Sequence, residues 1–249
     1  MAELQVEVAD GIAEVRLNRP EKKNALTLRL FEEIAAAGER LKAEAGLRAV
    51  ILAGQGGDFC AGLDLAVMQS LAGRIDEMRS RLPTPLGGGA ANWFQRPCAV
   101  WAELPVPVIA AIEGVCLGGG LQLALAADIR ICRPDARLAV MEAKWGMIPD
   151  MGITQSLPKL MAADRAKELM MTARMISGDE AAALGLVTRL ADDPPAAARA
   201  LAEEISGRSP EAVAGIKRLV DTAWTMPPGE GQRLEAEIEA PILGSANQI

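Results

Sequence analysis

The sequence predicts an α/β fold followed by a helical C-terminal region. Short apolar runs of strand length alternate with longer segments of helical periodicity over residues 1–190, which is typical of helices packed on a sheet. Two glycine-rich segments each follow a strand-like run and precede an apolar helix. From 191 to 249 the pattern predicts helices and no strand beyond Pro194. We therefore expect two regions, 1–190 and 191–249, in a chain long enough for one large core.

The N-terminal segment predicts a β-hairpin, a helix and a third strand. Residues 4–8 and 12–17 alternate apolar and polar side chains, and the Asp-Gly pair between them has the composition of a tight hairpin turn. Apolar residues then recur at helical spacing over 26–45. The run 49–53 is apolar throughout, as expected of a buried strand.

The stretch 112–131 is the centre around which the chain is organised. A strand-like run, 108–112, leads into it, and three glycines at 118–120 precede an apolar segment that predicts a buried helix. Glycine allows positive φ and a close approach of the backbone to another group, and a helix start presents unpaired N–H groups. Together they suit a negative or polarised oxygen. The glycine-rich segment at 54–65 is a second site of this kind. Glycines that serve packing alone remain the alternative.

The remaining elements follow from the same periodicities. The glycine- and proline-containing loop at 82–90 is expected to be mobile, either as a pocket wall or as a plain linker. Helices are expected at 90–102, 161–173, 178–184, 197–207 and 211–224, and strands at 128–132, 138–141 and 186–190.

Composition limits the chemistry that the chain can perform. It contains no histidine and no tyrosine, so acid–base chemistry falls to Asp, Glu, Lys or Cys, and histidine metal ligation is excluded. The net charge of −7 without a basic block argues against nucleic acid as a partner. No run reaches the roughly 18 to 20 apolar residues of a membrane span. The four cysteines lack metal-ligand spacing; we expect reduced thiols in a cytoplasmic protein and no metal site.

Four segments carry a resemblance to a known family: LNRPEKKNAL at 17–26, FCAGLDL at 59–65, IEGVCLGGGLQLALAADIRI at 112–131 and MEAKWGMIPDMGITQSLPKL at 141–160. Together they resemble the enoyl-CoA hydratase/isomerase (crotonase) superfamily. The resemblance implies a crotonase-like fold of repeated ββα units with a C-terminal helical oligomerisation region, in a homotrimer or a dimer of trimers. It also implies an acyl-CoA substrate, and no cofactor beyond the coenzyme A that the substrate carries.

The resemblance assigns backbone and CoA-binding positions. By position, the backbone N–H groups of Leu63 and Gly119 would form an oxyanion hole for the thioester oxygen, which agrees with the two glycine-rich turns. One donor of this type is worth about 10² to 10³ in rate. The implied CoA-binding residues are Lys22, Lys23, Ala25 and Ala61. For the two lysines a solvated surface position is the alternative.

Three side chains are candidates for the acid–base step. The hydratases of the superfamily carry two glutamates; one matches Glu142 and the other position is Gln122 here. An amide can hold a water or orient a carboxylate, but it cannot exchange a proton near neutral pH. The dienoyl-CoA isomerases use acids at the positions of Glu142 and Asp150, although they also carry an acid where this chain has Gln122. A turn role after proline is the alternative for Asp150.

These residues favour double-bond isomerisation of an enoyl-CoA, with Glu142 as base or acid, Asp150 as its partner and Gln122 as a positioning group. Enoyl-CoA hydration by Glu142, with Gln122 placing the water, is an alternative mechanism. A CoA-thioester-binding protein with little catalysis is an alternative of another class. RNA binding, which one branch of the superfamily shows, is disfavoured by the acidic charge.

Overall fold

A six-stranded sheet forms the centre of the molecule. The computed structural model describes residues 2–86 and 89–248. The strands lie in the order β1-β2-β3-β4-β6-β9; β1 and β2 pair antiparallel and the other neighbours pair parallel. Their bounds are β1 Leu4–Ala9, β2 Ile12–Leu17, β3 Ala49–Gly54, β4 Val108–Ile112, β6 Ile129–Cys132 and β9 Arg189–Leu190. The β1–β2 turn places Asp10 and Gly11 at positive φ, which confirms the predicted Asp-Gly hairpin.

A second, three-stranded sheet includes one strand from the central glycine-rich stretch, β5. It consists of β5 Val115–Leu117, β7 Arg137–Ala139 and β8 Ile176–Ser177, in the order β5-β7-β8. β5 was not predicted from the sequence, because three residues between turn-forming glycines are too few to show a periodicity. Gly114 and Gly118 flank this strand, and both have a φ of 53°.

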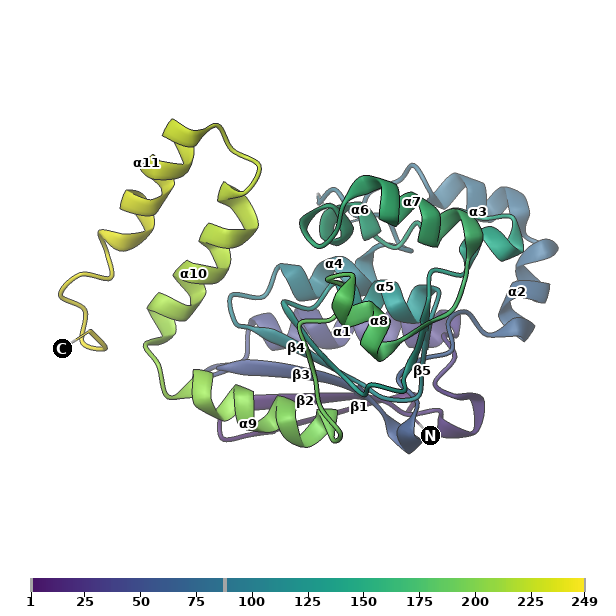
Figure 1. Ribbon diagram of the computed structural model, residues 1–249, viewed down its shortest axis with the longest axis horizontal. Helices are drawn as coiled ribbons and strands as arrows, with labels where there is room; N and C mark the ends of the chain where they lie inside the picture. Colours follow the sequence, from purple (N-terminus) through teal and green to yellow (C-terminus); the bar gives the residue numbers. More distant parts are fainter. Residues whose placement is uncertain (1, 87–88, 249) are drawn as a thin grey trace.

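Helices lie on both faces of the large sheet (Figure 1). The helices of the described chain are α1 Leu28–Lys42, α2 Leu65–Ala72, α3 Ile75–Arg81, α4 Arg96–Ala102, α5 Gly119–Leu125, α6 Ile153–Ser156, α7 Ala163–Thr172, α8 Gly178–Ala183, α9 Pro194–Ser206, α10 Pro210–Ala223 and α11 Pro228–Glu239. Short 3₁₀ helices lie at Pro20–Lys22, Gln55–Gly57, Glu142–Trp145 and Leu157–Lys159. The predicted α/β class is confirmed. None of the described helices is long and apolar enough to cross a membrane.

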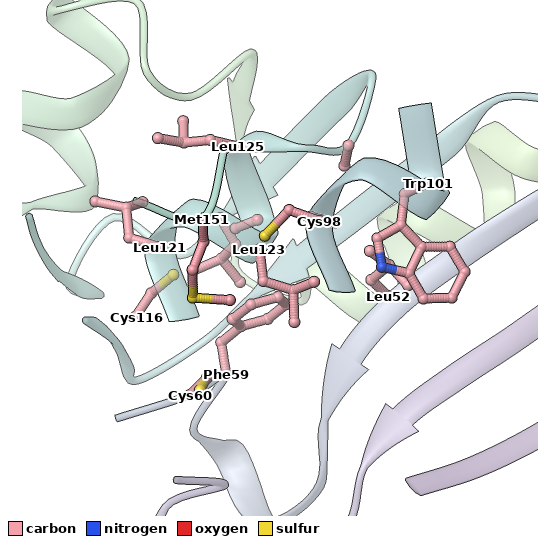
Figure 2. Packing of buried hydrophobic residues seen from close by; sticks show 14 of the residues in the cluster. Leu52, Phe59, Cys60, Cys98, Trp101, Cys116, Leu121, Leu123, Leu125 and Met151 are labelled. Carbon is pink, nitrogen blue, oxygen red and sulfur yellow. The ribbon is translucent and has the colours of Figure 1, made fainter. Parts of the chain in front are cut away.

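Two apolar clusters hold the helices to the sheet. The larger cluster packs α1, α4 and α5 through side chains that include Trp101 and Leu123, and Figure 2 shows Met151 among them. The smaller cluster lies under α9, where Ala198 and Ala202 pack on apolar side chains of the central strands. Because the side chains of α5 are buried on all sides, the glycine turn at its start has little freedom to move.

The α10–α11 hairpin stands to one side of this body (Figure 1). A Cβ added at Gly215 would lie 2.8 Å from Cγ2 of Ile238, so the two helices pack closely on each other. Ile216 and Val220 of α10, and Trp224 directly after its last residue, are spaced four residues apart. They are 61%, 40% and 70% exposed. This stripe is apolar and largely uncovered by the described chain. The division of the chain at 190 stays a prediction.

The helix predicted over 90–102 is wrong in its first part, because α4 begins at Arg96. The side chain of Asn92 accepts hydrogen bonds from two following N–H groups, at 2.9 and 3.0 Å. This local turn replaces the first turn of the predicted helix. Of the loop predicted at 82–90, residues 87–88 lie outside the described residues.

Two other elements are shorter than their predictions. The helix predicted over 26–45 is α1, whose first turn is capped by the side chain of Thr27. The strand predicted over 186–190 pairs only as β9: the N–H of Leu186 donates to the carbonyl of Ala181 at 2.9 Å, and the carbonyl of Leu186 accepts from Nε of Arg130 at 2.7 Å.

Candidate active site

The two glycine-rich segments of the sequence lie side by side. The N–H of Cys60 donates to the carbonyl of Val115 at 2.9 Å, and the N–H of Leu117 donates to the carbonyl of Cys60 at 2.9 Å. A Cβ at Gly120 would lie 2.6 Å from the Cβ of Cys60 and 2.7 Å from its carbonyl oxygen. Only glycine therefore allows the start of α5 to approach this turn.

Both turns line one cavity, and each contributes a residue whose backbone N–H has no partner in the described chain. Leu63 and Gly119 both line a cavity of about 350 Å³. No hydrogen bond joins either N–H to another described residue, and Gly119 is the first residue of α5, where helical N–H groups have no partner within the helix. A pair of free N–H donors at a cavity can bind a polarised oxygen.

Glu142 is a buried acid of this cavity. It lines the cavity beside Gly118 and Gly119 and is only 7% exposed. Its Oε1 accepts a hydrogen bond from Nε2 of Gln122 at 2.7 Å, whereas Oε2 is buried and has no partner in the described chain. Burial raises the pKa of Glu142, and the nearby charge of Asp150 raises it further. A carboxyl with a raised pKa suits proton transfer.

Gln122 connects Glu142 to the segment that follows it. The side chain projects from α5 and is 3% exposed. While Nε2 donates to Glu142, Oε1 accepts a hydrogen bond from the N–H of Met151 at 2.9 Å. The amide therefore ties the residue after Asp150 to the buried acid.

Asp150 lies near Glu142 but does not line the same cavity. Its side chain is half-buried, and burial raises the pKa of its carboxyl. Its charge acts on Glu142 and also on Cys98 of α4. The fold thus brings the three predicted side chains into one neighbourhood, and of the two predicted acids Glu142 alone reaches the cavity.

Three of the four predicted CoA-binding residues, Lys22, Ala25 and Ala61, line the cavity. Lys23 does not. It has a positive φ of 49°, and its ammonium group pairs with a carboxylate oxygen of Asp58 at 3.3 Å. The cavity therefore offers Lys22 as its cation.

An apolar wall of the cavity was missed by the sequence analysis. It consists of Leu65, Met68, Trp145 and Met147. Leu65, Trp145 and Met147 are 60%, 49% and 43% exposed, which is high for large apolar side chains and is typical of a surface that an apolar ligand covers. The only signal in the sequence was the apolar WGMI run inside a segment of turn formers.

The comparison with known proteins decides the family. A family model described as enoyl-CoA hydratase/isomerase matches residues 7–242. The chain belongs to this family. Its fold agrees with that of solved members: the crystal structure of enoyl-CoA hydratase from Bacillus anthracis superposes with a TM-score of 0.88 at 32% identity, covering 99% of this chain and 93% of the other.

Curated relatives in the enoyl-CoA hydratase/isomerase family include both hydratases and isomerases. The methylglutaconyl-CoA hydratase of Mus musculus is 37% identical over 169 residues, which cover 68% of this chain and 50% of the relative. The Delta(3,5)-Delta(2,4)-dienoyl-CoA isomerase of Mus musculus is 38% identical over 174 residues, which cover 66% and 50%. The chain spans about half the length of these curated relatives.

Proposed function

We propose that the protein is an acyl-CoA enzyme that moves a proton along an enoyl-CoA thioester and so shifts its double bond. The observation that carries this proposal is the meeting, at one cavity, of a buried carboxylate that has a free oxygen with two free backbone N–H groups. The carboxylate is Glu142, and the N–H groups belong to Leu63 and Gly119. Chemistry next to a thioester places negative charge on the carbonyl oxygen, which such donors stabilise.

In the proposed reaction, Glu142 removes a proton from the carbon next to the thioester. The electrons of the broken C–H bond move through the conjugated system to the carbonyl oxygen, where the N–H groups of Leu63 and Gly119 bind the enolate as an oxyanion hole. The acyl chain is proposed to extend beyond the cavity to Asp150, which gives its proton to the far carbon. The electrons then return from the oxygen, and the double bond re-forms in a new place. Burial keeps the pKa of Asp150 raised, which favours the protonated form that this step needs.

Hydration of an enoyl-CoA is the alternative, and relatives named as hydratases support it. It would require Gln122 to place the attacking water. The oxygen of that amide already accepts from Met151, and one of its N–H donors is bound to Glu142. Isomerisation is the favoured reaction because it needs no group from Gln122 beyond these two bonds. Binding of CoA esters without turnover is the alternative of another class.

The CoA moiety is proposed to lie against Lys22, Ala25 and Ala61, since Lys22 supplies positive charge for phosphate. Lys23 would have to leave Asp58 to contribute. We propose no cofactor beyond CoA, because two carboxyl groups and two N–H donors supply every group that the reaction uses. Four buried, free cysteines support a reducing, cytoplasmic location.

Asp150→Asn tests the isomerase assignment. The variant keeps the shape of the side chain but cannot give or take a proton, so isomerisation of a 3,5-dienoyl-CoA is expected to fall by at least about 10²-fold. Any hydration of crotonyl-CoA is expected to change far less. Proton NMR measures both rates. The exposed Asp164→Asn in α7 serves as the matched control. Small, equal effects of Asp150→Asn on both reactions would leave Asp150 with a turn role only.

We also propose that the chain forms a homotrimer or a dimer of trimers in which a second copy covers α10. A groove of about 970 Å³ lies between α10 and the body, with Ile216 and Trp224 on one side and Leu125 and Ile129 on the other. A largely exposed apolar stripe of this kind is typical of a surface that another chain buries.

Introducing charge into this stripe tests the oligomer. Ile216→Glu combined with Trp224→Glu is expected to convert the assembly into monomers, because two charges would be buried without partners. Light scattering on the protein as it elutes from a size-exclusion column gives the mass of the assembly. Arg218→Glu lies on the same helix but outside the groove, and it is expected to leave the mass unchanged. A double variant of unaltered mass would contradict the proposed interface.

A further inference from the structure

We infer that Gln122 is a positioning residue that acts through Glu142: it holds one carboxylate oxygen and leaves the other as the proton-transferring atom. This inference rests on the proposed role of Glu142 as the base. It adds a role for Gln122, whose amide cannot itself exchange a proton near neutral pH.

The orientation of the Gln122 amide follows from its neighbours. The backbone N–H of Met151, at 2.9 Å, can only donate, so the amide oxygen must face it. The NH₂ group then faces Glu142 and donates to Oε1 at 2.7 Å. The amide is buried, and both of its ends are engaged. Oε1 of Glu142 is therefore held, whereas Oε2 is buried and has no partner among the described residues.

In this chain the side chain at position 122 accepts a hydrogen bond at one end and donates one at the other. Glutamine does both. An ionised glutamate could accept from Met151, but it would meet Glu142 with a second negative charge in place of a donor. An asparagine is one methylene shorter, so its amide would not reach both Met151 and Glu142. The residue type at this position thus matches its two partners, which a space-filling role alone would not require.

The hydrogen bond from Gln122 opposes the effect of burial. Burial raises the pKa of Glu142, and the hydrogen bond donated by Gln122 lowers it. The other charged groups that line the cavity are Lys22 and Asp64. Because a general base must be ionised to accept a proton, loss of the donor is expected to shift the acid limb of the rate profile to higher pH.

Titration of the Glu142 carboxyl by ¹³C NMR tests this inference without any substrate. The signal is assigned by its disappearance in Glu142→Gln. In Gln122→Met, which removes both hydrogen bonds, the midpoint is expected to rise by about one pH unit. In Gln122→Glu, which keeps an acceptor for Met151, it is expected to rise further, since two carboxylates then share the site. The second variant remains informative if the first fails to fold.

Steady-state kinetics of the Gln122 variants and a control substitution at another buried amide complete the test. Both Gln122 variants are expected to lower kcat for 3,5-dienoyl-CoA by more than about tenfold with little change in KM, and to shift the acid limb of kcat/KM upward. Asn92→Asp exchanges another buried amide that does not line the Glu142 cavity, and it is expected to leave the Glu142 midpoint unchanged.

Two results would overturn the inference. One is an unmoved Glu142 midpoint in both Gln122 variants. The other is an equal movement in Asn92→Asp, which would show a general response to a buried charge. Failure of the proposed function looks different: Glu142→Gln would then remain active, whatever the titration of the carboxyl shows.

Discussion

Glu142→Gln is expected to lower turnover of a 3,5-dienoyl-CoA by at least about 10³-fold while affinity for the CoA ester changes by less than about threefold. The amide keeps an acceptor for the hydrogen bond from Gln122, so the cavity retains its shape, but the proton-accepting oxygen is lost. Steady-state kinetics gives the turnover, and calorimetry gives the affinity.

The control for this variant is a charge removed elsewhere. Glu168 is an exposed residue that pairs with Arg174 at 3.2 Å, and Glu168→Gln is expected to leave turnover unchanged. Turnover of Glu142→Gln within about tenfold of the parent would remove Glu142 from the mechanism, since a lost general base costs about 10² or more.

Gly120→Ala is expected to lower kcat by about 10² to 10³. The new Cβ would meet both the Cβ and the carbonyl oxygen of Cys60 at under 3 Å, and backbone atoms cannot rotate away as a long side chain can. The start of α5 must shift, and with it the N–H of Gly119 that is proposed to hold the enolate. The variant is measured per folded molecule, with circular dichroism giving the folded fraction.

Gly229→Ala is the matched control, because a Cβ at this position of α11 meets nothing within 4 Å. It is expected to keep full activity. A folded Gly120→Ala protein with unchanged kcat would show that the approach of α5 to Cys60 does not set the donor geometry.

Sequence patterns predicted the order of the main strands and helices because each is long enough to show a period. These patterns did not predict where α4 and β9 begin. Asn92 builds a turn ahead of α4, and Arg130 donates to the carbonyl of Leu186, which lies outside β9. Neither contact is visible in the sequence, since each joins an ordinary polar side chain to backbone that only the fold brings near.

The residues of the candidate site also fall into a group that the sequence predicted and a group that it did not. Glycine-rich turns and a resemblance to a known family pointed to Leu63, Gly119 and Glu142, which line one cavity. The ion pair of Lys23 with Asp58 could not be predicted, because only the fold brings these two residues together. The apolar wall was also missed, because its members come from α2 and from the turn after Glu142 and meet only in three dimensions.

Proton NMR in D₂O tests the central claim most directly, using purified protein with crotonyl-CoA, a 3-enoyl-CoA and a 3,5-dienoyl-CoA. We predict that the double bond shifts in the 3-enoyl-CoA, in the 3,5-dienoyl-CoA or in both. We predict no addition of water to crotonyl-CoA. Water added across the double bond of crotonyl-CoA, with no shift in the other two esters, would contradict isomerisation and establish hydration. Binding of all three esters without any change would contradict catalysis itself.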